Sequence, residues 1–184
     1  MRFFLIHGAY GGPNENWLPW LAEKLRSYGH EVIVPQFPTP QDQTLQNWMN
    51  VFSPYLDKVD QDTVFVGHSL GVAFTLSVLE KARIRVRACF LVAGFVGSLN
   101  NPHFDPINQS FTNKSFNWNT IRGSAKEFYL FYSENDPYVP LQKGRELAGH
   151  LHVPLLVHKN AAHFNASAGF STFPALLKRI QLIT

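Results

Sequence analysis

The residues with the clearest catalytic potential lie in the stretch Val64–Ala73, VFVGHSLGVA, where a serine stands between two glycines. Ser69 follows an apolar run typical of a strand and precedes a segment typical of a helix. This context predicts a nucleophile elbow, a sharp turn that exposes the serine hydroxyl. Gly67 and Gly71 would let strand and helix approach closely. The alternative is an ordinary helix cap, since serine is favoured at that position.

A serine hydroxyl needs a base to act as a nucleophile at neutral pH, and histidine is a common base. His163, in HKNAAHFNAS, follows the last predicted strand, and His158 is the competing candidate. A carboxylate would fix the tautomer of that histidine. Asp136, in SENDPYVP, is in position to do so, with Glu134 as the alternative. The order Ser, Asp, His is that of the α/β hydrolases, so the sequence predicts a Ser69–His163–Asp136 triad.

Attack by serine on a carbonyl creates an oxyanion, which backbone N–H groups can stabilise. The amide of Leu70, at the start of the predicted helix, is one candidate donor. The loop HGAYGGPNENW after the first strand offers the amide of Ala9 or Tyr10, and the sequence leaves both open. Its glycine spacing matches neither a dinucleotide loop nor a phosphate loop. His7 and His68 are interpreted as hydrogen-bonding groups beside the site rather than as catalysts.

Composition argues against several other classes of protein. Eight histidines and one cysteine contain no His-Glu-x-x-His motif and no cysteine pair, so we expect no metal and no other cofactor. The formal charge of +3 is spread along the chain and does not predict nucleic-acid binding. The apolar run after Met1 is too short for a signal peptide or a membrane span. We therefore expect a cytoplasmic protein that does not bind membranes.

Six apolar runs must position these residues. They predict strands at Phe3–Ile6, Glu31–Val34, Thr63–Val66, Ala88–Val92, Phe128–Tyr132 and Leu155–Val157. Segments with helical periodicity lie between most of them and at the end of the chain: Trp17–Tyr28, Leu45–Phe52, Leu70–Lys81, Leu141–His150 and Phe173–Ile180. This alternation predicts a single α/β domain over residues 1–184, a three-layer, doubly wound sheet of about six mainly parallel strands. Sites in such sheets lie at the carboxyl ends of the strands, where the three candidate residues fall.

The connection from Gly94 to Ser124 is unusually long and rich in aromatic residues. A connection of this length predicts a functional cover or a mobile loop. We expect Phe95, together with Tyr10 and Trp17 of the first loop, to line an apolar substrate pocket. The alternative is that several of these rings fill the core beneath the connection.

Five segments in order resemble a known family: HGAYGGPNENWLPWLAEKL, GHEVIVPQFP, DTVFVGHSLG, SENDPYVP and AAHFN. Over most of its length the chain is similar to the YdeN-like or retinoblastoma-binding-protein-9-like small serine hydrolases. The resemblance implies a minimal α/β-hydrolase fold without the first two strands and the large cap of bigger relatives. It places the triad on Ser69, Asp136 and His163. Ala162 stands where the family often has glycine, and Val72 where it often has a small residue or cysteine.

The sequence therefore predicts a cofactor-independent serine hydrolase. It would cleave carboxylic esters of short to medium acyl length through an acyl-enzyme on Ser69, with a small-molecule ester as its partner. One alternative is a protein-interaction module on a hydrolase scaffold with weak catalysis. Another is a peptidase or acyltransferase that uses the same triad. The physiological substrate, any protein partner and the oligomeric state stay open.

Overall fold

The computed structural model describes residues 1–184, arranged around a six-stranded sheet of order β2-β1-β3-β4-β5-β6. Every neighbouring pair of strands is parallel. The strands are β1 (Arg2–Ile6), β2 (Glu31–Ile33), β3 (Thr63–His68), β4 (Val86–Val92), β5 (Ala125–Ser133) and β6 (Leu155–His158). The predicted fold class and all six predicted strands are confirmed.

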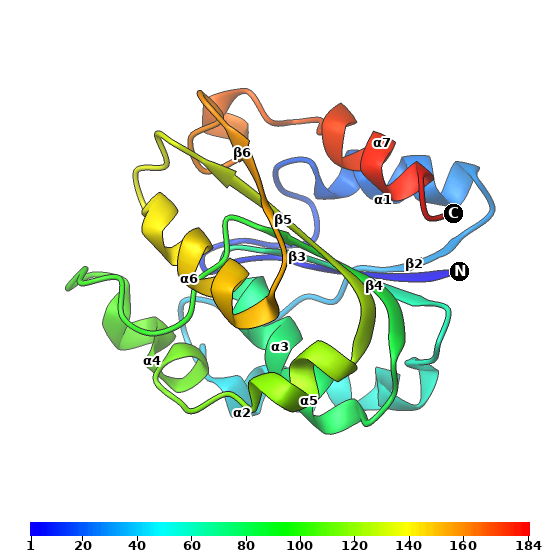
Figure 1. The fold of residues 1–184 in the computed structure, drawn as a ribbon, viewed down its shortest axis with the longest axis horizontal. Coiled ribbons are helices and arrows are strands. Elements are labelled where there is room, and N and C mark those ends of the chain that lie inside the picture. The colour runs from blue at the N-terminus through cyan, green and yellow to red at the C-terminus, as the bar shows by residue number, and fades with distance from the viewer.

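Helices cover both faces of the sheet. They are α1 (Leu18–Ser27), α2 (Leu45–Phe52), α3 (Leu70–Ala82), α4 (Asp105–Thr112), α5 (Trp118–Gly123), α6 (Leu141–Leu151) and α7 (Pro174–Gln181), with 3₁₀ turns η1 (Ser53–Lys58) and η2 (Ala166–Ala168). Figure 1 shows α1 and α7 on one face and α2 to α6 on the other, which makes three layers. None of these helices has the length and apolar character needed to cross a membrane.

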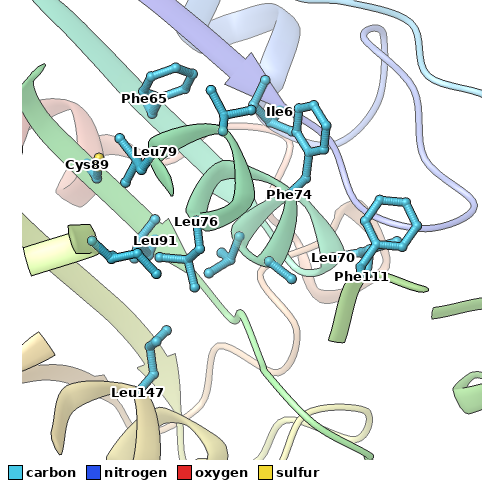
Figure 2. Packing of buried hydrophobic residues seen from close by; sticks show 14 of the residues in the cluster. Ile6, Phe65, Leu70, Phe74, Leu76, Leu79, Cys89, Leu91, Phe111 and Leu147 are labelled. Carbon is cyan, nitrogen blue, oxygen red and sulfur yellow. The ribbon is translucent and has the colours of Figure 1, made fainter. Parts of the chain in front are cut away.

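Two buried apolar clusters, one on each face of the sheet, hold the layers together. The larger contains 29 buried residues and lies on the side of α2 to α6, whereas the smaller contains 22 and lies beneath α1 and α7. Figure 2 shows part of the larger cluster, with Phe74 and Leu76 of α3 near Ile6 and Leu91 of the strands. Cys89 belongs to this cluster, where burial raises the pKa of its thiol, so the thiol is inert.

The strand order places a topological switch beside β1. From β1 the chain passes to the edge strand β2 and then returns to β3 on the other side of β1. Loops from the carboxyl ends of β1 and β3 therefore leave in different directions and open a crevice, where open α/β sheets bind ligands. The first of these loops begins at His7, and the second contains Ser69.

The connection Gly94–Ser124, predicted as a functional cover or a mobile loop, contains helices α4 and α5, which the sequence did not predict. Both helices are held to the core by apolar side chains. The ring of Phe111 in α4 packs edge-on against Trp48 with centroids 4.9 Å apart, and Ile121 of α5 is fully buried. Part of the connection still covers the site, as described below.

Candidate active site

Ser69 occupies the turn between β3 and α3, as the elbow motif predicts. Its backbone has φ 54° and ψ −122°, a conformation that is unfavourable for a residue with a Cβ atom. The Ser69 amide donates to the carbonyl of Val92 at 2.9 Å, and the Ser69 carbonyl accepts from Val72 at 3.0 Å. The side chain makes no capping hydrogen bond to the helix. The hydroxyl is therefore not engaged as an ordinary helix cap.

Glycines permit close backbone approaches around this turn. A Cβ atom on Gly71 would lie 2.5 Å from the carbonyl oxygen of Ile6, and one on Gly67 would lie 2.9 Å from the carbonyl oxygen of Gly71. A Cβ atom on Gly8 would lie 2.8 Å from Cβ and 3.3 Å from Oγ of Ser69. The start of α3 thus rests on the end of β1, and the loop after β1 touches the serine.

His163 and Asp136 meet as predicted. Nδ1 of His163 donates to Oδ2 of Asp136 at 2.8 Å, and these side chains are only 10% and 1% exposed. The other carboxylate oxygen accepts from the amides of Tyr138 at 2.8 Å and Val139 at 3.0 Å. These bonds fix the carboxylate and leave Nε2 of His163 as the nitrogen that can accept a proton. His163 and Ser69 line the same cavity, but no hydrogen bond joins them in this structure.

The competing candidates lie elsewhere. His158, at the end of β6, packs against Phe164 and Phe173 with ring centroids 5.3 and 6.0 Å apart. Burial lowers its pKa. Glu134 is exposed at the start of the next loop. Neither residue lines the cavity that contains Ser69.

The cavity above Ser69 has a volume of about 250 Å³. Its lining residues are His7, Gly8, Ala9, Tyr10, Gly11, Glu15, Asn16, His68, Ser69, Phe95, Leu99, Phe104, Asn108, Tyr138, Val139, His163 and Asn165. Leu99 was not predicted to line the pocket. Phe104 belongs to the aromatic string of the connection Gly94–Ser124, in which the sequence does not distinguish pocket residues from core residues. Tyr138 and Val139 could have been found, because they closely follow Asp136.

Two of the three predicted substrate-pocket residues lie on this wall. Phe95 is almost fully buried at the cavity, and Tyr10, half-exposed, stacks on His103 with centroids 5.8 Å apart. Trp17 is a correction, because it is fully buried outside the cavity lining. Its indole Nε1 donates to the carbonyl of Phe164 at 2.9 Å, so its one polar group is bonded to the backbone and is not free to bind a ligand.

The structure separates the two candidates for the second oxyanion donor. The amide of Tyr10 donates to Oγ1 of Thr39 at 2.7 Å, whereas the amide of Ala9 has no hydrogen-bond partner. The amide of Leu70 opens α3 and has no partner within the helix. The geometry favours Leu70 and Ala9 over Tyr10. Thr39 gave no signal in the sequence, because it reaches this loop from beyond β2.

His7 and His68 are buried and neutral. Nε2 of His7 accepts from the amide of Phe37 at 3.0 Å while Nδ1 donates to the Gly8 carbonyl at 2.8 Å, and burial lowers its pKa. Burial, with a smaller contribution from the neighbouring imidazole of His163, lowers the pKa of His68 to about 3. His68 Nε2 donates to the carbonyl of His163 at 2.9 Å. Both residues thus support the backbone of the site, as the sequence analysis interprets them.

The two departures from the resembled family are accommodated. Ala162 adopts φ 42°, in the left-handed region that favours glycine. Val72 is fully buried against Gly94, where an added Cβ atom would lie only 2.4 Å from the valine side chain. Val72 therefore does not narrow the cavity. No group of three or more His, Cys, Asp or Glu side chains is arranged to hold a metal ion.

Comparison with known proteins identifies the family and the fold of the chain. A family model described as "Serine hydrolase" matches residues 3–182. YdeN of Bacillus subtilis (strain 168) is 30% identical over 175 residues, which cover 94% of this chain and 90% of YdeN. Serine hydrolase RBBP9 of Rattus norvegicus is 22% identical over 163 residues, 87% of this chain and 85% of RBBP9.

Solved structures show the same fold. The crystal structure of the B. subtilis ydeN gene product superposes with a TM-score of 0.92 at 27% identity, covering 99% of this chain and 97% of that one. A YdeN-like protein from Pectobacterium atrosepticum has a TM-score of 0.70 at 21% identity, covering 97% and 88% of the two chains, and shows the fold alone. The chain has the α/β-hydrolase fold and belongs to the serine hydrolase family.

Proposed function

We propose that the protein hydrolyses carboxylic esters of short to medium acyl length through an acyl-enzyme on Ser69. The observation that carries the proposal is the 2.8 Å hydrogen bond from His163 Nδ1 to Asp136, at the same cavity as the strained serine. This bond holds the imidazole in the tautomer that can take a proton at Nε2. The hydrogen bond between Ser69 and His163 would form in the complex with substrate, because catalytic hydrogen bonds are often long or absent in free enzymes.

In the proposed reaction, Oγ of Ser69 attacks the ester carbonyl carbon while Nε2 of His163 takes the hydroxyl proton. The amides of Leu70 and Ala9 donate to the oxyanion of the tetrahedral intermediate. The intermediate collapses, and the leaving alkoxide takes the proton from His163. A water molecule then gives a proton to His163 and attacks the acyl-enzyme. Release of the carboxylic acid returns that proton to Ser69.

The acyl preference rests on the size of the cavity. A cavity of about 250 Å³ bounded by Phe95, Leu99 and Phe104 is at the small end for ligand sites. No large cap covers the sheet edge to enclose a long chain. The physiological ester is expected to be a small molecule.

The first test is the intact mass after brief exposure to a fluorophosphonate probe. Wild type should gain one adduct, and Ser69→Ala none. Ser69→Ala should also lose ester turnover by on the order of 10⁴-fold or more, because the triad acts as a unit. Ser77→Ala is a matched control. Ser77 is a buried serine of α3, the helix that follows Ser69, and its hydroxyl donates to the Ala73 carbonyl.

The control should label and turn over esters as wild type does. A folded wild-type protein that forms no adduct would favour the binding-module alternative over the hydrolase. An adduct with no ester turnover would direct the search to amides or acyl acceptors. We also propose that the protein acts in the cytoplasm, which cell fractionation tests.

A further inference from the structure

The segment Ala161–Phe164, here called the histidine loop, has an unusual backbone. Ala162 and Phe164, on either side of His163, have φ 42° and 51°. Neither residue is glycine, and the left-handed region is disfavoured for residues with a Cβ atom. A loop with two such residues persists only when its surroundings determine its conformation.

Those surroundings are four side chains from other segments. Each residue of the histidine loop has one backbone polar group bonded to one of them, at 2.9 Å in every case. The bonds are Ala161 N–H to Ser133 Oγ, Ala162 N–H to Asn135 Oδ1, His68 Nε2–H to the His163 carbonyl, and Trp17 Nε1–H to the Phe164 carbonyl.

Three of the four side chains are buried. Trp17 is 0%, Ser133 1% and His68 4% exposed, and hydrogen bonds are stronger where water is excluded. The fourth, Asn135, is exposed, but its Oδ1 also accepts from the Ser133 hydroxyl at 2.7 Å. The ring of Trp17 packs edge-on against His68 with centroids 5.8 Å apart. The contacts therefore form two linked pairs on opposite ends of the histidine loop.

The position of these pairs in the chain links the parts of the site. Ser133 ends β5, and Asp136 follows three residues later in the same loop. His68 directly precedes Ser69. One pair thus ties the histidine loop to the loop that carries the carboxylate, and the other ties it to the nucleophile elbow.

We propose that Ser133, Asn135, His68 and Trp17 are positioning residues that hold the His163 imidazole in register with Asp136 and Ser69. They act through His163 and not on the reacting atoms. The inference rests on the proposed function in taking His163 as the catalytic base. It predicts that loss of one bond impairs proton transfer while substrate binding is retained.

The test compares Ser133→Ala with Ser133→Thr. Ser133→Ala leaves the buried Ala161 amide without an acceptor, and kcat should fall on the order of 10- to 100-fold with KM little changed. Ser133→Thr keeps a hydroxyl and should restore most of kcat. Ser124→Ala is the matched control, because buried Ser124 precedes the opposite end of β5 and its hydroxyl donates to the Thr120 carbonyl at 2.7 Å. It should lower thermal stability without lowering kcat.

A second readout does not depend on turnover. The low-field proton NMR signal of His163 Nδ1–H, assigned by its loss in His163→Gln, should weaken in Ser133→Ala and return in Ser133→Thr. Trp17→Phe, which removes the donor to Phe164 but keeps an aromatic ring, should weaken it too. If Ser133→Ala does not fold, Trp17→Phe decides.

The outcomes are distinct. Folded Ser133→Ala and Trp17→Phe proteins with wild-type kcat and an unchanged signal would overturn the positioning role. A wild-type protein that hydrolyses no ester would instead count against the proposed function, and the NMR comparison alone would then decide whether the four side chains position His163.

Discussion

Nδ1 of His163 lies 2.8 Å from Oδ2 of Asp136, while the other oxygen of that carboxylate accepts two backbone amides. The carboxylate is thus held from the loop side and presents one oxygen to the imidazole. An isosteric amide at this position would keep Oδ1 as an acceptor, but an NH2 group in place of Oδ2 could not accept the hydrogen bond from His163. The two functions of Asp136, folding its own loop and orienting His163, can therefore be separated by one substitution.

We predict that Asp136→Asn keeps the fold and loses on the order of 10³- to 10⁴-fold in kcat near neutral pH, because the imidazole would adopt the wrong tautomer. Steady-state ester kinetics and circular dichroism measure the two effects. A folded Asp136→Asn protein with near-native kcat would remove Asp136 from the proposed triad.

The contact between α3 and β1 leads to a prediction about stability. A Cβ atom on Gly71 would lie 2.5 Å from the Ile6 carbonyl oxygen and 2.6 Å from that of His7, and backbone atoms cannot move aside cheaply. Gly71→Ala should therefore lower the free energy of unfolding by about 3 kcal/mol or more. Urea unfolding measures it.

Gly149 gives the matched control, since it lies inside α6 and an added Cβ atom would meet nothing within 4 Å. Gly149→Ala should raise the free energy of unfolding by about 0.5–1 kcal/mol, because alanine favours a helix interior. Equal urea midpoints for the two variants would show that the close approach at Gly71 carries no cost.

The order of strands and helices was predictable because the central strands are buried on both faces and therefore read as continuous apolar runs. Some strand ends were predicted correctly, such as Ile6 and Val92, but others were not. The run Phe128–Tyr132 belongs to a strand that starts at Ala125, because Val86 of β4 pairs with that residue. Pairing continues past the apolar residues, so composition alone places the strand ends too far inward.

Helices α4 and α5 were missed for a different reason. Their sequences, DPINQSFT and WNTIRG, contain too few apolar residues for a periodic apolar pattern to stand out. Their stability comes from packing of residues such as Phe111 and Ile121 into the core. Tertiary contacts of this kind are not visible in a short window of sequence.

The candidate site also contains features that the sequence predicted and features that it did not. Ser69, Asp136 and His163 were found because each follows a strand and their order has chemical meaning. The wrong placement of Trp17 and the failure to predict the hydrogen bond of Ser133 have one physical cause. The indole of Trp17 donates to the carbonyl of Phe164, which lies 147 residues away in the chain. The Ser133 hydroxyl accepts from the amide of Ala161, which lies 28 residues away. Such pairings depend on the folded arrangement, which a single sequence does not display.

The wall of the cavity gives a prediction about acyl length. Wild-type kcat/KM should rise from acetyl to medium-chain p-nitrophenyl esters and fall for long chains, because the cavity is only about 250 Å³. Phe104→Ala should shift the ratio of long-chain to short-chain kcat/KM by about tenfold toward long chains. Trp118, which stacks on His150 outside this cavity, is the control aromatic residue. Rates that keep rising with chain length in wild type would contradict the size limit.

The buried imidazole of His68 gives a prediction about pH and stability. Its pKa is lowered to about 3 in the folded protein, against 6.5 for an ordinary histidine. Between these values the unfolded chain binds a proton that the folded protein does not, so the free energy of unfolding must fall as the pH falls. The neutral His68 imidazole makes its full contribution to the free energy of unfolding above about pH 6.5. Each pH unit below that lowers this free energy by up to about 1.4 kcal/mol. Burial lowers the pKa of His7 as well, so His7 also lowers the free energy of unfolding as the pH falls.

Urea unfolding at pH 7.5, 6, 5 and 4 measures this loss. His68→Gln keeps a side-chain N–H donor but cannot titrate, so its stability should depend less on pH than that of wild type, with the two curves converging toward low pH. Parallel curves would mean that His68 takes up its proton equally in the folded and unfolded states. In that case its bond to the His163 carbonyl would not require the neutral ring, and the buried environment of His68 would be more polar than the packing of Trp17 against it indicates.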